Sequence, residues 1–189
     1  ARFYMPGHKG RMPAPFTQAA PYDITEIAGA DNLYQCAGAI RALEEEFADA
    51  YRVGDCLLSA GGSTLCIQTM LYLARGRGST VICGRIIHRS AVAAMGLLGL
   101  DPCWLPGRIA SRREGIPGIA LPPTPEDVEA AIAAHPDAGS VYITSPDYFG
   151  QLANIADIAE VCHRSGKVLL VDNAHGAHLG CFRAALHPM

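Results

Sequence analysis

After Gly54, short apolar runs alternate with segments that have the features of helices, and this alternation most restricts what the chain can fold into. The apolar runs lie at 56–58, 81–83, 102–105, 141–143 and 168–171. Strands and helices in alternation predict βαβ units, and therefore a mostly parallel sheet with helices on both faces. We expect an α/β fold with three αβα layers.

The segments between these runs carry helix signals. Thr124 is a typical N-cap, Pro125 suits the first helical position, and acidic residues follow in the first turn. Asn154 can cap another helix, whose apolar face repeats every three or four residues. Further helices are expected at 63–74 and 88–98.

The N-terminal part has a different character. Residues 1–38 are rich in Pro and Gly, and an amphipathic helix follows that carries Ile40, Leu43, Phe47 and Tyr51. We therefore expect an arm and linker helix at 1–53 and a partial α/β domain at 54–189.

Composition excludes several classes of function. Half of the chain is hydrophobic and its net charge is −3, which gives no reason to expect nucleic acid or a membrane surface as partner. No apolar run approaches the roughly 18–20 residues of a membrane span, and the start does not have the pattern of a signal peptide. The seven cysteines form no CxxC pair, so a zinc knuckle is not expected. We expect a cytoplasmic protein.

Polar and unusual sequence gathers where the expected strands end. In open parallel sheets, ligands bind at the carboxyl ends of the strands. Four such places are Gly61–Thr64, Arg85–Ser90, Ser145–Gly150 and Asp172–His178. Their convergence predicts a binding site at one edge of the sheet.

The last of these places allows several interpretations. A nucleotide hydrolase would need GxxxxGK[ST], but the only lysines are Lys9 and Lys167, and neither has that context. Asp172, His175 and His178 suit zinc or iron by type, although no partner cluster is evident. Polar groups that merely cap a helix and a sheet edge are a structural alternative.

A cofactor with a phosphate and a heteroaromatic ring accounts for more of these places at once. Gly62, Ser63 and Thr64 at a helix start offer backbone N–H groups, hydroxyls and the positive end of the helix dipole to a phosphate. His88 offers a flat ring for stacking, and Asp172 offers a carboxylate to a ring nitrogen. This constellation suits pyridoxal phosphate, with no metal.

The sequence also resembles a known family, the bacterial ornithine/lysine/arginine decarboxylases, in their large domain. These are pyridoxal-phosphate enzymes of the aspartate-aminotransferase fold (fold type I). The resemblance covers nearly the whole chain, and its motifs occur in the family's order. They are MPGHKG (5–10), DITE (23–26), ADNLY (30–34), GGST (61–64), RIIHRS (85–90), TSPDYFG (144–150) and VDNAHGAH (171–178).

The resemblance implies a role for each matching residue. His88 would stack on one face of the ring and Ala174 on the other, Asp172 would pair with the pyridine nitrogen, and His175 would lie near the ring hydroxyl or the substrate. The catalytic residues implied are His88, Asp172 and His175. The cofactor-binding residues are Gly62, Ser63, Thr64, His88, Asp172, Ala174 and His175.

The chain also departs from the family's pattern. Family members often have Glu where Asn173 stands and Asn where Ile86 stands. Their Schiff-base lysine lies one strand beyond the Asp-x-Ala-His segment, and this chain stops at Met189. We therefore expect a large domain that is incomplete at its C-terminus and inactive by itself.

The function implied is decarboxylation of a basic amino acid by a homodimer, with the small-molecule amino acid as substrate. An aminotransferase-like enzyme would share the Asp and the phosphate site. A remnant without catalysis, which binds a partner or dimerises, is the alternative from another class.

Overall fold

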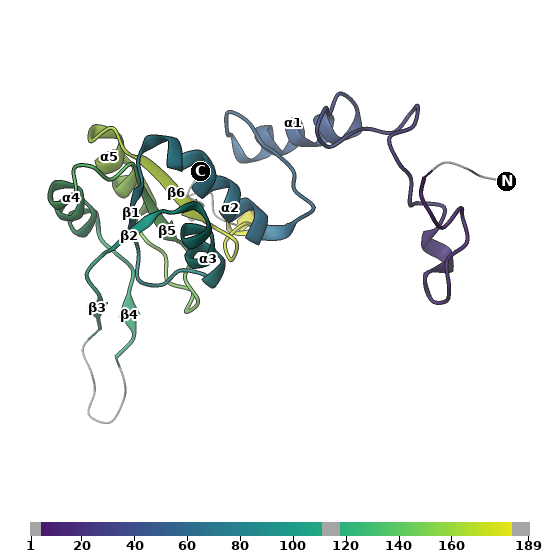
Figure 1. Cartoon of the computed structure of the whole chain (residues 1–189). Coiled ribbons are helices and arrows are strands. Elements are labelled where there is room, and N and C mark those ends of the chain that lie inside the picture. Colours follow the sequence, from purple (N-terminus) through teal and green to yellow (C-terminus); the bar gives the residue numbers. More distant parts are fainter. Residues whose placement is uncertain (1–4, 111–117, 183–189) are drawn as a thin grey trace. The chain divides into compact units, whose positions relative to one another are not determined.

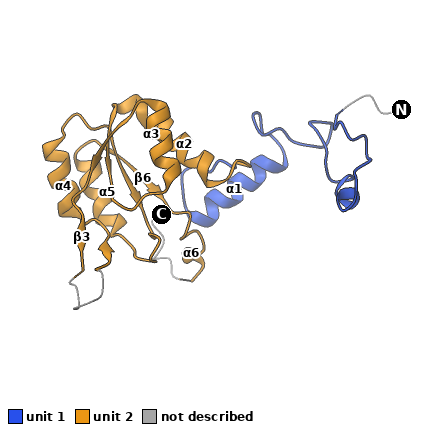
Figure 2. Cartoon of the chain, turned by 60° about the horizontal axis from the view of Figure 1, so that its bottom comes forward, with its two compact units in different colours: residues 1–58, 189 blue, residues 59–188 orange. Residues whose placement is uncertain are grey.

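The computed structural model describes residues 5–110 and 118–182, and the chain divides into two compact units, 1–58 and 59–188 (Figure 2). The expected arm (1–53) and partial domain (54–189) extend into residues 1–4 and 183–189, which lie outside the described residues, as do residues 111–117.

The second unit is built on a four-stranded parallel sheet in the order β2-β1-β5-β6 (Figure 1). Its strands are β1 (Thr80–Cys83), β2 (Asp101–Trp104), β5 (Ser140–Thr144) and β6 (Val168–Asp172). Each contains one of the predicted apolar runs, except that Leu105 of the run 102–105 follows β2, so the expected parallel sheet is confirmed.

Helices cover both faces of this sheet. The helices are α2 (Gly62–Ala74), α3 (Arg89–Leu98), α4 (Pro125–Ala134) and α5 (Ile155–Arg164). Two hydrophobic cores result: Val81 and Cys83 of β1 pack with α2 and α3, whereas Ile82 packs with α4 and α5. Because neighbouring side chains of a strand point to opposite faces, one short apolar run serves both cores. The three-layer αβα fold is confirmed.

The helix signals in the sequence act as expected. Thr124 Oγ1 accepts the backbone N–H of Asp127 at 3.3 Å, and Asp127 Oδ2 accepts that of Thr124 at 2.9 Å, which forms a capping box at α4. Asn154 Oδ1 accepts the N–H of Asp157 at the start of α5.

Two regions of the chain differ from the prediction. The apolar run 56–58 forms no strand: the Leu57 side chain is 74% exposed, and the N–H of Leu58 donates to the Glu44 carboxylate at 2.9 Å instead of to a neighbouring strand. An antiparallel pair, β3 (Arg108–Ile109) and β4 (Ala120–Leu121), was not anticipated, because two-residue strands carry no periodicity. Short helical turns also lie at η2 (Arg75–Arg77) and α6 (Leu179–Phe182).

The strand order places a binding crevice. From β1 the chain moves through α3 to β2 on one side, then returns through α4 to β5 on the other side. The order therefore reverses between β1 and β5, and open α/β sheets bind ligands at the carboxyl ends of strands where this reversal occurs.

The first unit contains a short turn, η1 (Phe16–Ala19), and the amphipathic helix α1 (Ala39–Tyr51). Asp31 holds the start of α1: its Oδ2 accepts N–H groups of Gly38, Ile40 and Arg41, and its Oδ1 accepts that of Ala37 at 3.0 Å. In the described parts of both units, no helix has the length and apolar character that crossing a membrane requires.

The stability of the loop before α1 should depend on pH through Asp31. The Ala37 N–H, helped by other backbone N–H groups, lowers the pKa of Asp31 from its ordinary value of 3.8 to about 2. A lowered pKa means that this contribution is complete above pH 3.8 and is lost as the pH falls toward 2. In NMR titrations, the amide signals of Ala37 and Ile40 should move with a midpoint near 2, and they should not show this step in Asp31→Asn. A midpoint at or above 3.8 would contradict the assignment.

Candidate functional site

A cavity of about 340 Å³ lies at the carboxyl edge of the sheet in the second unit, within the size range of small-molecule sites. All seven predicted cofactor-binding residues line it. Its complete lining is Gly61, Gly62, Ser63, Thr64, Ile67, His88, Thr144, Tyr148, Asp172, Ala174 and His175. Residues from four separate stretches of sequence therefore meet at one place, as the strand-end rule predicts.

The N-terminus of α2 forms one wall. Gly62 has a φ of +69°, a backbone conformation that favours glycine, at the turn into the helix. Among the described residues, the N-cap side chain closes the first turn in α3, α4 and α5 but not in α2. The first N–H groups of α2 and the hydroxyls of Ser63 and Thr64 are thus available to an anion at the positive end of the helix dipole.

His88 forms a second wall and is itself the N-cap of α3. Its Nδ1 accepts the backbone N–H of Ser90 at 3.2 Å and lies 2.6 Å from Ser90 Oγ. Because Nδ1 accepts, a neutral ring carries its proton on Nε2. The cap fixes the imidazole in the cavity wall before any ligand arrives.

Asp172, the last residue of β6, is 6% exposed and is the one carboxylate in the cavity lining. Its Oδ2 accepts the hydroxyl of Tyr142 at 3.2 Å, and its Oδ1 accepts the backbone N–H of Ala174 at 3.2 Å. Each oxygen can accept a further hydrogen bond. The carboxylate is therefore held from two sides and remains able to accept a donor from the cavity.

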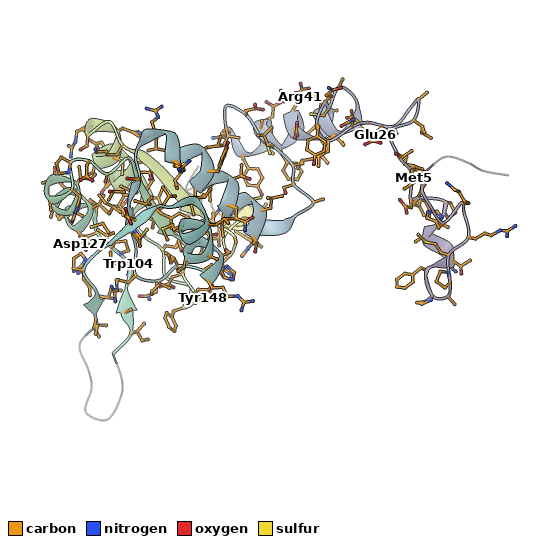
Figure 3. The ribbon with its side chains drawn as sticks, in the orientation of Figure 1. Met5, Glu26, Arg41, Trp104, Asp127 and Tyr148 are labelled. Carbon is orange, nitrogen blue, oxygen red and sulfur yellow. The ribbon has the colours of Figure 1, made fainter. Side chains whose placement is uncertain are left out.

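Tyr148, labelled in Figure 3, lies in the loop after β5. It lines the cavity, but the predicted set of site residues did not include it. Its ring centroid lies 6.5 Å from that of His88 and 5.4 Å from that of His175. Buried Asp147 fixes this loop by accepting the N–H groups of Phe149 and Gln151. The sequence offered one signal for Tyr148: it lies in the loop after β5, which the strand-end rule selected as a region without singling out a residue.

Thr144 is a further site residue that was not predicted. It pairs with Asp172 across β5 and β6, is 7% exposed and lines the cavity. Its Oγ1 makes no hydrogen bond of acceptable geometry among the described residues, although it acts on the pKa of the nearby Tyr142 phenol. A buried hydroxyl without a partner is unfavourable, so a ligand that bonds to it would relieve a cost of the fold.

Two other residues considered in the sequence lie elsewhere. Lys167, which has no nucleotide-binding context, precedes β6 at the opposite edge of the sheet, where its Nζ donates to the carbonyl of Pro136 at 2.7 Å. His178, considered with Asp172 and His175 as a metal ligand, packs its ring against Phe182 at 6.1 Å and does not line the cavity. The described part of the chain contains no group of three or more His, Cys, Asp or Glu placed to hold a metal ion.

The cavity suits a phosphate joined to a flat heteroaromatic ring. The uncapped α2 terminus matches the phosphate, the fixed His88 ring and the small Ala174 match a planar group, and buried Asp172 matches a protonated ring nitrogen. The buried Thr144 hydroxyl adds one more polar atom for a ring substituent.

Comparison with known proteins identifies the family. Residues 16–187 match the family model of the Orn/Lys/Arg decarboxylase major domain. An arginine decarboxylase of Halalkalibacterium halodurans is 34% identical over 185 residues, and one of Bacillus subtilis is 30% identical over the same length. Each match covers 94% of this chain but 37% of the relative, so the chain spans little more than a third of these proteins.

Solved structures agree on the fold. The pyridoxal-5'-phosphate dependent protein YhfS of Escherichia coli matches with a TM-score of 0.55 at 12% identity, over 71% of this chain and 33% of that one. The 3-amino-5-hydroxybenzoic acid synthase matches with a TM-score of 0.53 at 23% identity, over 71% and 32%. At these identities the likeness concerns the fold alone.

Thr144→Val should stabilise the unliganded protein. Valine has nearly the same shape and removes a buried hydroxyl that lacks a partner, so the free energy of unfolding should rise by about 1 kcal/mol. Ser140→Ala is the matched control, because Ser140 Oγ in the same strand is also buried without a partner but does not line the cavity. Urea denaturation measures the free energy of unfolding of both variants. A loss of stability in Thr144→Val alone would show that the Thr144 hydroxyl has a hydrogen-bond partner in solution.

Proposed function

Because the chain belongs to the Orn/Lys/Arg decarboxylase major-domain family, we propose that its cavity is the pyridoxal-phosphate site of an enzyme that decarboxylates a basic amino acid. The observation that carries this proposal is the meeting of all seven expected cofactor-binding residues in one cavity. The chain spans 37% of its curated relatives, so the activity is proposed for the whole protein of which this sequence forms the cofactor site.

The α2 terminus would hold the phosphate. The backbone N–H groups from Gly62 onward and the hydroxyls of Ser63 and Thr64 donate hydrogen bonds to its oxygens, and the helix dipole favours its charge. Nothing in this wall reacts. Its role would be to anchor the phosphate end of the cofactor in the cavity that the ends of β5 and β6 also line.

The ring would lie between His88 and Ala174. Asp172 would accept a hydrogen bond from the ring nitrogen and would favour its protonated form, and Tyr148 and His175 supply further lining of the same cavity. Bound pyridoxal phosphate supplies an electron sink for the charge left when a bond to the substrate's α-carbon breaks. The buried Asp172 charge makes that sink stronger by stabilising a positive ring.

We propose arginine as the first substrate to test, because four of the relatives found are arginine decarboxylases. An aminotransferase is the alternative activity, since it needs the same phosphate site and the same Asp. Two departures from the family's pattern lie close to predicted site residues: Ile86 is two residues before His88, and Asn173 lies between Asp172 and Ala174. If arginine is not decarboxylated, other basic amino acids are the next substrates to test.

We also propose a cytoplasmic homodimer, as the resemblance to the family implies. An apolar groove of the second unit supports such an interface. The groove lies between α2 and α3 and has a volume of about 240 Å³. Its lining includes the exposed side chains of Leu65, Tyr72 and Leu97. Exposed apolar patches of this kind often mark contacts between proteins.

Addition of pyridoxal phosphate to the purified protein should change its absorbance spectrum in a saturable manner. Asp172→Ala should weaken this binding about tenfold or more, because it removes a charge-assisted hydrogen bond. Asp101→Ala, the same change in an exposed residue at the opposite end of the sheet, should bind as the parent does. A parent that shows no spectral change, or an Asp172→Ala variant that binds equally well, would exclude the cofactor site.

Product analysis separates the two activities in the full-length protein. With arginine and pyridoxal phosphate, a decarboxylase releases carbon dioxide and the corresponding amine in equal amounts. An aminotransferase instead forms the keto acid and requires a keto acid as amino-group acceptor. Carbon dioxide release that is lost in Asp172→Ala is the expected result, and keto acid formation would assign the alternative.

A further inference from the structure

The hydroxyl of Tyr142 is a buried polar group that the proposed cofactor contacts do not use. Tyr142 is 0% exposed, in the middle of β5, and belongs to the hydrophobic core beneath α2 and α3 with Leu71 and Leu170. A phenylalanine would fill nearly the same space without the cost of burying a hydroxyl. The hydroxyl is therefore the part of this residue that needs an explanation.

The sheet register directs this hydroxyl to Asp172. Tyr142 pairs with Leu170, and Thr144 pairs with Asp172, so Tyr142 and Asp172 are diagonal neighbours on one face of β5 and β6. The hydroxyl donates to Asp172 Oδ2 at 3.2 Å. Because the core encloses the phenol ring, the donor stays in place whether or not the cavity holds a ligand.

The charges around Asp172 fit a permanent donor. Burial, and then the neighbouring Asp172 carboxylate, raises the pKa of Tyr142, so the phenol keeps its proton and donates. The other ionisable side chains that face the cavity are His88 from the start of α3, Tyr148 from the loop after β5 and His175 from the turn after β6. None of these three has a hydrogen bond to Asp172 among the contacts of the described residues.

We infer that Tyr142 is a positioning residue for this site: its hydroxyl holds Asp172 Oδ2 so that the carboxylate stays oriented toward the ring nitrogen of a bound cofactor. The inference rests on the proposed function, because it assumes that Asp172 meets that nitrogen. Tyr142 does not touch the cavity itself and acts only through Asp172. The competing view is that Asp172 merely satisfies the hydroxyl of a core tyrosine.

Binding of two cofactor forms separates these views. The probes are pyridoxal phosphate and its 1-deaza analogue, in which a C–H group replaces the ring nitrogen, and their dissociation constants are measured for the parent, Tyr142→Phe, Asp172→Asn and the double variant. The parent should prefer pyridoxal phosphate. Tyr142→Phe should reduce this preference about tenfold, which corresponds to about 1.4 kcal/mol, and should have no further effect in the Asp172→Asn background.

Control variants make the result specific. Tyr22→Phe makes the same change in an exposed tyrosine of the first unit and should leave the preference unchanged. Urea denaturation checks that Tyr142→Phe is folded. If it is not, 3-fluorotyrosine at position 142 keeps the ring and makes the hydroxyl a stronger donor, so the preference should rise, and an unchanged preference would contradict the inference.

The outcomes distinguish this inference from the proposed function. A parent that binds neither form, or binds both equally, overturns the pairing of Asp172 with the ring nitrogen and the inference with it. A parent that prefers pyridoxal phosphate, with the same preference in folded Tyr142→Phe, leaves the proposed function standing and shows that Tyr142 is only a core residue.

Discussion

The parallel pairing of β5 with β6 is the interaction on which the rest of the site depends. Its register sets Thr144 opposite Asp172 and Tyr142 opposite Leu170. Since side chains alternate between the faces of a sheet, a shift of one residue would turn Asp172 from the α2–α3 face to the opposite core. The apolar side chains of both strands oppose such a shift, because each would have to leave its own core. Hydrophobic packing thus fixes the register that places the polar side chains of the site.

The helices that cover this face bring their N-termini to the same edge. The α2 helix precedes β1 and α3 follows it, and the starts of both line the cavity through Ser63 and His88. The two helix starts differ: the His88 side chain caps the first turn of α3, whereas the N-cap of α2 is Gly61, which has no side chain to cap it. The open terminus favours an anion and the capped one supplies a fixed ring, so one edge can receive both ends of a phosphate-bearing cofactor.

Periodicity and end signals were sufficient to predict the layers of the second unit. The runs at 81–83 and 168–171 became strands because each had a neighbour to pair with, whereas 56–58 did not, although it is equally apolar. The predicted site residues follow strands or begin helices, where local sequence is informative. Tyr142 and Thr144 lie inside β5 instead, and their relation to Asp172 depends on the strand that pairs beside them. A single strand's sequence contains no information on that register.

Three buried polar side chains on β5 and β6, Tyr142, Thr144 and Asp172, add little to the stability of the fold. Asp172 has donors from two elements, Tyr142 in β5 and the N–H of Ala174 beyond β6, which makes a buried charge tolerable without a cation beside it. Thr144, next to it, has no partner among the described residues. A fold selected for stability alone would replace these three side chains by apolar ones of similar size. Asp172 and Thr144 line the cavity and Tyr142 supports Asp172 from the core, an arrangement that a site for a charged ring would require.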